Sequence, residues 1–340
     1  MKDKLTKTVH SRNITIGGDS IISVQTMLKR SFNSYSSEYI QSLKYYGTDI
    51  LRFSIDGNYD KNELSTFIKT SPLPLVLDVK ADKQQALDSL KSGIDAVRIN
   101  PILLTNSHIE EIIRMAKDVN AIVRIGTNEG STKGQDAVST ILNTIEMCEK
   151  LGFTNIVTSV KASNAESTIL LNTQLSNKTE YPIHIGLTEA GDSITSAVRS
   201  TIVMSKLLNN GIGDTIRYSM AGSEKSEVIA GNELLSSLGL REPKLHLVIC
   251  PSCSRATFLT GDFINSVMDD LYKVTYIKNK SFTLAIMGCP LNGIGEAKDA
   301  DIGISGTSDE VILFNKGHII DRVKPNDAKE ILIKRIMEYV

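Results

Sequence analysis

The amino-acid sequence predicts an α/β protein in which a TIM-type (β/α)8 barrel is followed by a smaller α+β domain. Short β-branched runs alternate eight times with segments of helical period, and roughly one hundred residues remain after the eighth repeat. The chain has 340 residues, more than the ~250 at which a single core usually stops growing. We therefore expect two domains, a barrel over residues 1–240 and a second domain over residues 241–340.

The eight predicted strands are short runs rich in Val, Ile and Leu, as in strands buried within a parallel sheet. They begin at Ile21, Asp49, Leu73, Ala96, Ala121, Asn155, Ile183 and Asp214. Each run is followed by apolar residues at helical spacing, for example in "NSHIEEIIRMAKDV" from Asn106. Eight such units close a barrel of about 250 residues, so the last helix is predicted to end near Leu240.

Charge and hydropathy exclude several classes of partner. The net charge is -1, so no overall field draws the chain to nucleic acid or to an anionic membrane. The opening "MKDKLTKTVH" lacks the apolar stretch of a signal peptide, and no later run approaches the roughly 18 apolar residues of a membrane span. We expect a cytoplasmic protein in which any anion site is a local cluster of basic residues.

Polar side chains follow the predicted barrel strands at their carboxyl ends, where barrel enzymes place their chemistry. These residues are Arg52, Asp78, Arg98, Asn100, Arg124, Asn128, Lys161, Ser163, His184, Glu189, Arg217 and Ser219. Any one of the cations could be a solvated loop charge. Five cations in one barrel mouth are costly unless they are paired, and together they indicate an anionic ligand such as a phosphate or a diphosphate.

The four cysteines are too few for a disulfide framework in a chain of this length. Cys250 and Cys253 follow the predicted strand "LHLVI", and Cys289 follows the predicted strand "FTLAIM". Cys148 and His246 lie within a predicted helix and a predicted strand, where we expect packed side chains. Three thiolates suit an iron–sulfur cluster with one open iron, and zinc remains an alternative. The stretch Gly293–Gly295 brings Glu296 near Cys289, so its carboxylate could be a fourth ligand.

Several motifs resemble the 4-hydroxy-3-methylbut-2-enyl diphosphate synthase family, iron–sulfur enzymes of the non-mevalonate isoprenoid pathway. They run from "IGGDSIISVQTM" through "RIGTNEGS", "IHIGLTEAG" and "GIGDTIRYSM" to "CPSCSR" and "MGCPLNGIGEAKDADIGI", and cover nearly the whole chain. The resemblance implies a TIM barrel followed by a reductase-like iron–sulfur domain. It also implies a homodimer in which the cluster domain of one subunit closes over the barrel of the other. The family's [4Fe–4S] cluster, bound by three cysteines and one glutamate, matches Cys250, Cys253, Cys289 and Glu296.

The resemblance further implies an oxidoreductase that opens the ring of 2-C-methyl-D-erythritol 2,4-cyclodiphosphate and releases water. Flavodoxin or ferredoxin would donate the electrons. Glu189 would be the acid or base at the reacting carbons, although it could instead pair with an arginine, and Glu296 would act at the cluster. The expected substrate contacts are Arg52, Lys80, Arg98, Arg124, Asn128, Lys161, His184, Arg217, Ser219 and Asn292.

Two departures from the family pattern lie at the barrel mouth. Where the family usually has Asp-Ile-His-Phe this chain reads "DVKA" from Asp78, and where the family has Gly-Asn after "RINP" it has Ile102 and Leu103. Two other functions stay open: a zinc-stapled barrel lyase acting on a phosphorylated sugar, and a non-catalytic iron–sulfur electron-transfer protein. The lack of a fourth strong zinc ligand disfavours the first alternative, and the row of strand-end cations disfavours the second.

Overall fold

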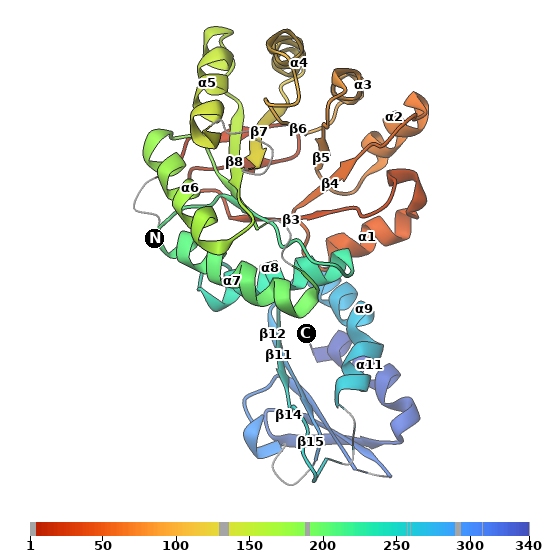
Figure 1. Cartoon of the computed structure of the whole chain (residues 1–340). Helices are drawn as coiled ribbons and strands as arrows, with labels where there is room; N and C mark the ends of the chain where they lie inside the picture. Colours follow the sequence, from red (N-terminus) through yellow and green to blue (C-terminus); the bar gives the residue numbers. More distant parts are fainter. Residues whose placement is uncertain are drawn as a thin grey trace. The chain divides into compact units, whose positions relative to one another are not determined.

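The protein folds into two compact units, Met1–Arg241 and Glu242–Val340. A computed structural model describes residues 5–128, 136–187, 191–256, 258, 260–289, 294–307 and 309–339 (Figure 1). The first unit is a ring of strands surrounded by helices, and the second unit is a mixed sheet covered by helices.

The first unit is a parallel barrel with the strand order β8-β7-β6-β5-β4-β3-β10-β9. A bridge between Thr158 and Ile183 joins β8 to β9 and closes the ring. The strands are β3 (Ser23–Met27), β4 (Ile50–Ser54), β5 (Leu75–Asp78), β6 (Ala96–Ile99), β7 (Ile122–Asn128), β8 (Ile156–Lys161), β9 (His184–Ile185) and β10 (Thr215–Ile216). The predicted TIM-type barrel is confirmed. The eight strands lie in the eight predicted runs, and β7 extends two residues beyond its run, "AIVRIG" from Ala121, to end at Asn128.

Eight helices follow the strands and form the outer layer in Figure 1. At each helix start an Asp, Asn, Ser or Thr side chain accepts a hydrogen bond from a backbone N–H of the first turn, which stabilises the helix at that point. The helices are α1 (Ser37–Tyr45), α2 (Lys61–Thr70), α3 (Lys83–Lys91), α4 (Asn106–Asp118), α5 (Ala137–Lys150), α6 (Ala165–Lys178), α7 (Ser193–Asn209) and α8 (Glu224–Ser237). A short 3-10 helix, η1 (Phe32–Ser34), precedes α1. In the described part of the chain, none of the helices is both long enough and apolar enough to cross a membrane.

An amino-terminal hairpin, β1 (Val9–His10) with β2 (Thr15–Ile16), was not predicted. Val9 and Ile16 pack on the side chains at the beginnings of five barrel strands: Ile50, Val76, Ala96, Ile122 and Val157. The hairpin therefore plugs the end of the barrel at which the strands start. Two-residue strands are too short to show the alternating pattern by which a strand is recognised.

Arg241 ties the end of the first unit to its beginning. Its Nη2 donates to the backbone oxygen of Ile22 and to Oδ2 of Asp49, each over 2.7 Å, and its Nη1 donates to Oδ1 of Asn232 over 2.6 Å. Ile22 immediately precedes β3, and Asn232 lies on α8. One side chain thus joins the first strand of the barrel to its last helix.

The second unit is a five-stranded sheet of order β11-β12-β13-β14-β15, in which β11, β12 and β13 are parallel and the other pairings are antiparallel. Helices α9 (Thr260–Lys278) and α11 (Ala328–Tyr339) share one buried apolar cluster with the sheet, and η3 (Pro325–Asp327) precedes α11. The strands are β11 (Leu245–Ile249), β12 (Phe282–Met287), β13 (Ile302–Gly306), β14 (Val311–Asn315) and β15 (His318–Val323). The predicted α+β domain is confirmed. The expectation of a packed His246 is wrong, because β11 is an edge strand and leaves this side chain exposed.

Candidate active site

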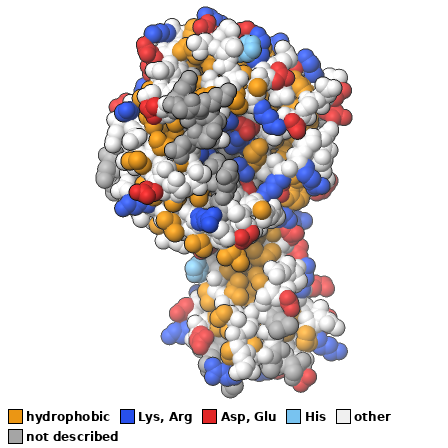
Figure 2. Space-filling view, viewed as in Figure 1, with side chains coloured by type: hydrophobic (Ala, Val, Ile, Leu, Met, Phe, Trp, Pro, Cys, Tyr) orange, Lys and Arg blue, Asp and Glu red, His pale blue; other side chains and the backbone are white. Residues whose placement is uncertain are grey.

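A cluster of buried cations lies inside the barrel toward the carboxyl ends of the strands. Arg52, Arg124 and Lys161 are only 8%, 5% and 7% exposed. Arg98 lies between Asp78 and Arg124 in the strand register, so these three residues form one row across β5, β6 and β7. On the face shown in Figure 2, Lys and Arg side chains are interspersed with Asp and Glu side chains. The row of cations inside the barrel differs from the mixed charges of that face.

Asp78 is the shared partner of two of these arginines. Its Oδ2 pairs with Nη2 of Arg52, and its Oδ1 lies 3.2 Å from Nη1 of Arg98. Arg98 also donates to the backbone oxygen of Gly126 over 2.8 Å, and a side chain at residue 126 would collide with the Arg98 guanidinium. Burial alone would raise the pKa of Asp78, but the charges of Arg52 and Arg98 outweigh it and lower the pKa from 3.8 to about 2.

Replacing Asp78 by asparagine should therefore change how stability depends on pH. Because the folded-state pKa lies below the unfolded value, the stabilisation is fully present above about pH 4 and is lost as the pH falls toward about 2. At neutral pH, Asp78→Asn should lower the free energy of unfolding by about 2 kcal/mol, and the loss should shrink on acidification. Urea unfolding at a series of acidic pH values measures this. Asp56→Asn, at a carboxylate that is 90% exposed, is the matched control, and equal pH profiles for all three proteins would contradict the assignment.

A second carboxylate, Glu227 of α8, reaches into the same region and was not predicted. The Glu227 side chain is fully buried. Its Oε2 lies 3.5 Å from Nε of Arg217, and its Oε1 lies 3.2 Å from Nζ of Lys29. Lys29 was also not predicted. Oε2 of Glu227 accepts a hydrogen bond from Thr26 over 2.8 Å. A signal did exist, because Glu227 lies on the same helical face as Gly231, Leu234 and Leu235. A charged residue on the apolar face of a helix is a reason to look for a buried partner.

Lys161 and Arg124 have no carboxylate within ion-pair distance among the described residues. Arg124 donates from Nη1 to Oε1 of Gln25 over 3.0 Å, while its Nε is buried with no partner in the described part of the chain. Burial is the main cause that lowers the pKa of both side chains well below their ordinary values. The charges of neighbouring cations add to it, and for Lys161 the largest of these contributions comes from Arg217. Both shifts show that burial and the neighbouring cations disfavour the charged form of these two side chains.

His184 lies on β9 beside these cations and is completely buried. Its Nδ1 is 2.7 Å from the hydroxyl of Thr215, and its Nε2 has no partner among the described residues. Burial, and then the charges of Arg124 and Lys161, lower its pKa well below the ordinary value. The imidazole is therefore neutral, with one nitrogen available to a ligand.

The other predicted barrel residues have different positions. Asn128 pairs in register with Lys161 at the ends of β7 and β8, and half-buried Ser219 follows β10. Lys80 lies apart from the buried cluster, because its side chain is 57% exposed and pairs with Asp56 over 3.0 Å. Glu189 and Asn292 lie outside the described residues.

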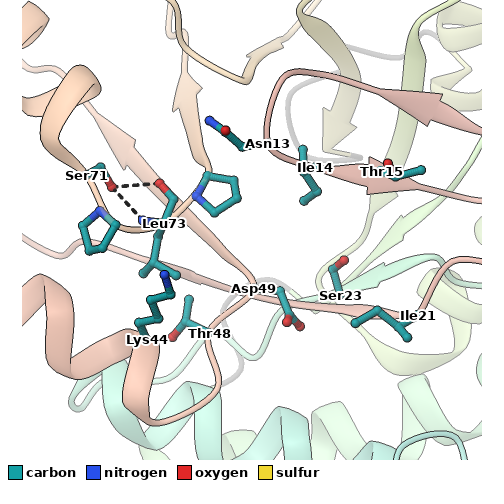
Figure 3. Close-up of a pocket in the computed structure, with 12 residues that line it drawn as sticks. Asn13, Ile14, Thr15, Ile21, Ser23, Lys44, Thr48, Asp49, Ser71 and Leu73 are labelled. Carbon is teal, nitrogen blue, oxygen red and sulfur yellow. Dashed lines mark hydrogen bonds between the residues drawn. The ribbon is translucent and has the colours of Figure 1, made fainter. Parts of the chain in front are cut away.

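A cavity of about 530 Å³ lies at the other end of the barrel, beside the amino-terminal hairpin (Figure 3). Its polar lining includes Lys44 and Asp49. The Asp49 carboxylate already accepts from the backbone N–H of Val24 and from Arg241, both over 2.7 Å. Because barrel enzymes place their chemistry at the carboxyl ends of the strands, the buried cation cluster is the stronger candidate for the active site.

The cysteine loops of the second unit meet at one edge of its sheet. Ile249 of β11 pairs with Ile286 of β12, and the backbone N–H of Cys250 donates to the Ile286 oxygen over 2.9 Å. Phe258, in the loop that follows Cys253, donates its backbone N–H to the Gly288 oxygen over 3.4 Å. The loops that carry Cys250, Cys253 and Cys289 are therefore attached to each other, and all three thiols are free.

These residues provide suitable donors for an iron–sulfur cluster. Cys253 is exposed. A hydrogen bond from the backbone N–H of Arg255 is the main cause that lowers the pKa of its thiol. The lower pKa favours the thiolate, the form that binds metal. Ile294, in the helical turn 294–296 that carries the exposed Glu296, packs against the same apolar cluster as Cys250. In the described ranges no three His, Cys, Asp or Glu side chains converge on the position of a single metal ion. Cys148 is buried within α5, as predicted.

Comparison with known proteins identifies the family. The GcpE TIM-barrel domain matches residues 6–232, and the GcpE protein C-terminal domain matches residues 246–338. The chain belongs to the GcpE family. Among GcpE relatives, proteins named 4-hydroxy-3-methylbut-2-en-1-yl diphosphate synthase (flavodoxin) from Thermotoga maritima and Ruminiclostridium cellulolyticum are 35% and 37% identical to this chain. The matches cover 98% of this chain and 97% of the Thermotoga protein, and 99% of both chains for the Ruminiclostridium protein.

Solved structures of other enzymes share the barrel of this GcpE chain. Dihydropteroate synthase from Yersinia pestis matches 68% of this chain and 98% of its own, with 14% identity and a TM-score of 0.50. 3-Dehydroquinate dehydratase from Geobacillus kaustophilus matches 70% of this chain and 98% of its own, with 13% identity and a TM-score of 0.51. At these identities the likeness concerns the fold alone.

Proposed function

We propose that this chain is a 4-hydroxy-3-methylbut-2-enyl diphosphate synthase, which opens the ring of 2-C-methyl-D-erythritol 2,4-cyclodiphosphate by reduction. One carbon–oxygen bond to the cyclic diphosphate breaks, one hydroxyl leaves as water, and two electrons and a proton are consumed. The observation that carries the proposal is a cluster of buried cations without enough carboxylates, in a chain whose full-length relatives are named for this activity.

The barrel cations supply the diphosphate site. Among the described residues, six cations face two carboxylates, Asp78 and Glu227, and the cations are Lys29, Arg52, Arg98, Arg124, Lys161 and Arg217. A diphosphate would compensate Arg124 and Lys161 and accept several charge-assisted hydrogen bonds at once. Neutral His184 would donate or accept one further hydrogen bond through Nε2. Asn128, Ser219 and Asn292 are proposed to complete the polar contacts.

The second unit is proposed to hold a [4Fe–4S] cluster through Cys250, Cys253, Cys289 and Glu296. When bound, the cluster supplies single electrons and a Lewis-acidic iron. Glu296 is exposed on its short helical turn, so its carboxylate can change partner with little repacking of the protein. Glu189 is proposed to hold or deliver the proton at the reacting carbons.

The proposed partners follow from the same family. The relatives from Thermotoga and Ruminiclostridium carry flavodoxin in their names, and we propose flavodoxin or ferredoxin as the donor of single electrons to this chain. A homodimer is also proposed, in which the second unit of one subunit closes over the barrel of the other.

Anaerobic purification followed by an activity assay tests the function. The protein should contain iron and acid-labile sulfide in a ratio near one, and with reduced flavodoxin it should convert the cyclic diphosphate to the linear product. Stoichiometric zinc without sulfide would favour a zinc-stapled lyase. A cluster that accepts electrons without any turnover of the cyclic diphosphate would favour an electron-transfer protein.

A further inference from the structure

Glu227 is the one fully buried carboxylate in contact with the cation cluster in the part of the chain that the structure describes. Four groups surround it, from two segments of the barrel: β3 with the residues just after it, and the residues just after β10. Thr26 of β3 donates to Oε2 over 2.8 Å, the backbone N–H of Met220 donates to Oε1 over 3.3 Å, and Lys29 and Arg217 contribute the cations. The carboxylate is thus fixed by neutral donors as well as by charges.

The two cations that contact Glu227 are less buried than the carboxylate. The side chains of Lys29 and Arg217 are 28% and 14% exposed, while that of Glu227 is 0% exposed. Nζ of Lys29 also donates to the backbone oxygen of Met220 over 2.5 Å. Each cation therefore keeps some exposed surface in addition to its contact with the carboxylate. We take this exposed surface as the place where a phosphate group would approach while Glu227 stays bound.

A carboxylate in this position has two opposing effects on an anionic ligand. It holds the two cations in place, which favours binding, and it cancels part of their charge, which weakens the attraction felt by the ligand. Substrate and product of the proposed reaction both carry a diphosphate. A site that attracts the diphosphate of the substrate also attracts that of the product, so a resident negative charge that weakens this attraction helps the product to leave.

We propose that Glu227 is the resident counter-ion of the diphosphate site, that it positions Lys29 and Arg217, and that its charge limits how tightly the site retains a diphosphate. Lys29 thereby becomes a further contact for the ligand's phosphate oxygens. This inference rests on the proposed function, because it takes the cation cluster to be the diphosphate site. Glu227 is a positioning residue and takes no part in the chemical step.

Binding of inorganic pyrophosphate to the full-length protein, measured by calorimetry at fixed ionic strength, tests the inference without the need for turnover. Glu227→Gln keeps the size of the side chain and removes its charge, so pyrophosphate should bind roughly tenfold more tightly. Lys29→Met should weaken binding roughly tenfold. In the double variant the two charge changes cancel, so its affinity should lie within about threefold of the original protein.

Asp214→Asn is the matched control for the loss of a buried carboxylate. Asp214 is 1% exposed and accepts hydrogen bonds from Thr6 and from the backbone of Ile183 at the other end of the barrel. Its replacement should lower stability without tightening pyrophosphate binding. In steady-state assays Glu227→Gln should lower both KM and kcat, because the product leaves more slowly, whereas a purely structural role would leave KM unchanged or raise it.

The possible outcomes separate the two proposals. If the original protein does not bind pyrophosphate, the diphosphate site itself is wrong. If it binds and Glu227→Gln binds equally or more weakly, the counter-ion role is wrong and the proposed function stands. Should Glu227→Gln fail to fold, the double variant decides, since an affinity as weak as that of Lys29→Met alone would show that the Glu227 charge does not matter.

Discussion

Replacing Cys250, Cys253 or Cys289 by serine should remove the cluster and abolish turnover. A serine hydroxyl is a harder and much less acidic ligand than a thiol, so the corresponding iron would be held poorly. Each variant should contain less iron and sulfide and should lose the visible absorption of the cluster. The measurement is iron and sulfide content with absorption spectra on anaerobically purified protein, followed by assay.

Two further variants make this test specific. Cys148→Ala removes the thiol that is buried in α5 and should leave iron, sulfide and turnover unchanged. Glu296→Ala should give an intermediate result: a cluster that assembles on three thiolates but is more labile, with turnover largely lost. Full activity in Glu296→Ala would exclude Glu296 as a ligand, and an intact cluster in any of the three serine variants would exclude that cysteine.

Replacing Lys161 by methionine should make the protein more stable and nearly inactive. Among the described residues, no carboxylate lies within ion-pair distance of the buried Lys161 ammonium. Burial is the main cause that lowers its pKa, and the charge of Arg217 is the next. Methionine keeps most of the length and removes the unpaired charge, so the free energy of unfolding should rise by about 1 to 2 kcal/mol. The ligand, however, would lose a buried charged contact, and kcat/KM should fall by about 100-fold or more.

Thermal or urea unfolding and steady-state assays of the same preparation measure both effects. Lys80→Met is the matched control, because that lysine is exposed and already paired with Asp56. It should change stability by less than about 0.5 kcal/mol and kcat/KM only slightly. Equal losses of activity in the two variants would mean that Lys80 binds the substrate as directly as Lys161. A less stable Lys161→Met protein would contradict the view that the ammonium lacks a partner.

The barrel and its cations could be predicted because each depends on a local pattern. Apolar runs identify strands that are buried on both faces. A cation near the carboxyl end of such a run, as at Arg52 and Arg98, is therefore expected to lie at the barrel mouth. The cysteine loops could be predicted for the same reason, since Cys250 and Cys289 each follow a recognisable strand. The family resemblance then supplied the reaction, which no spacing in the sequence contains.

The parts that could not be predicted depend on how distant segments meet. Lys29 and Glu227 are close only because β3 and α8 are neighbours in the closed ring, although nearly two hundred residues separate them in the chain. Lys80 lies two residues after Asp78, so an extended strand would return it to the barrel interior. β5 ends at Asp78, and the chain turns Lys80 outward to Asp56 instead.

The Arg241 contacts have a consequence for how the protein is made. Because β3 pairs with β10, the ring cannot close until the chain has been synthesised through Ile216. The hydrogen bonds of Arg241 to Ile22 and to Asn232 of α8 can form only after that. Contacts of such long sequence separation form late and slow folding. Until then β3 is an open edge strand, the kind of surface on which nascent chains associate wrongly. Arg241 is thus expected to secure the barrel once β10 has covered β3, at the carboxyl-terminal end of the first unit.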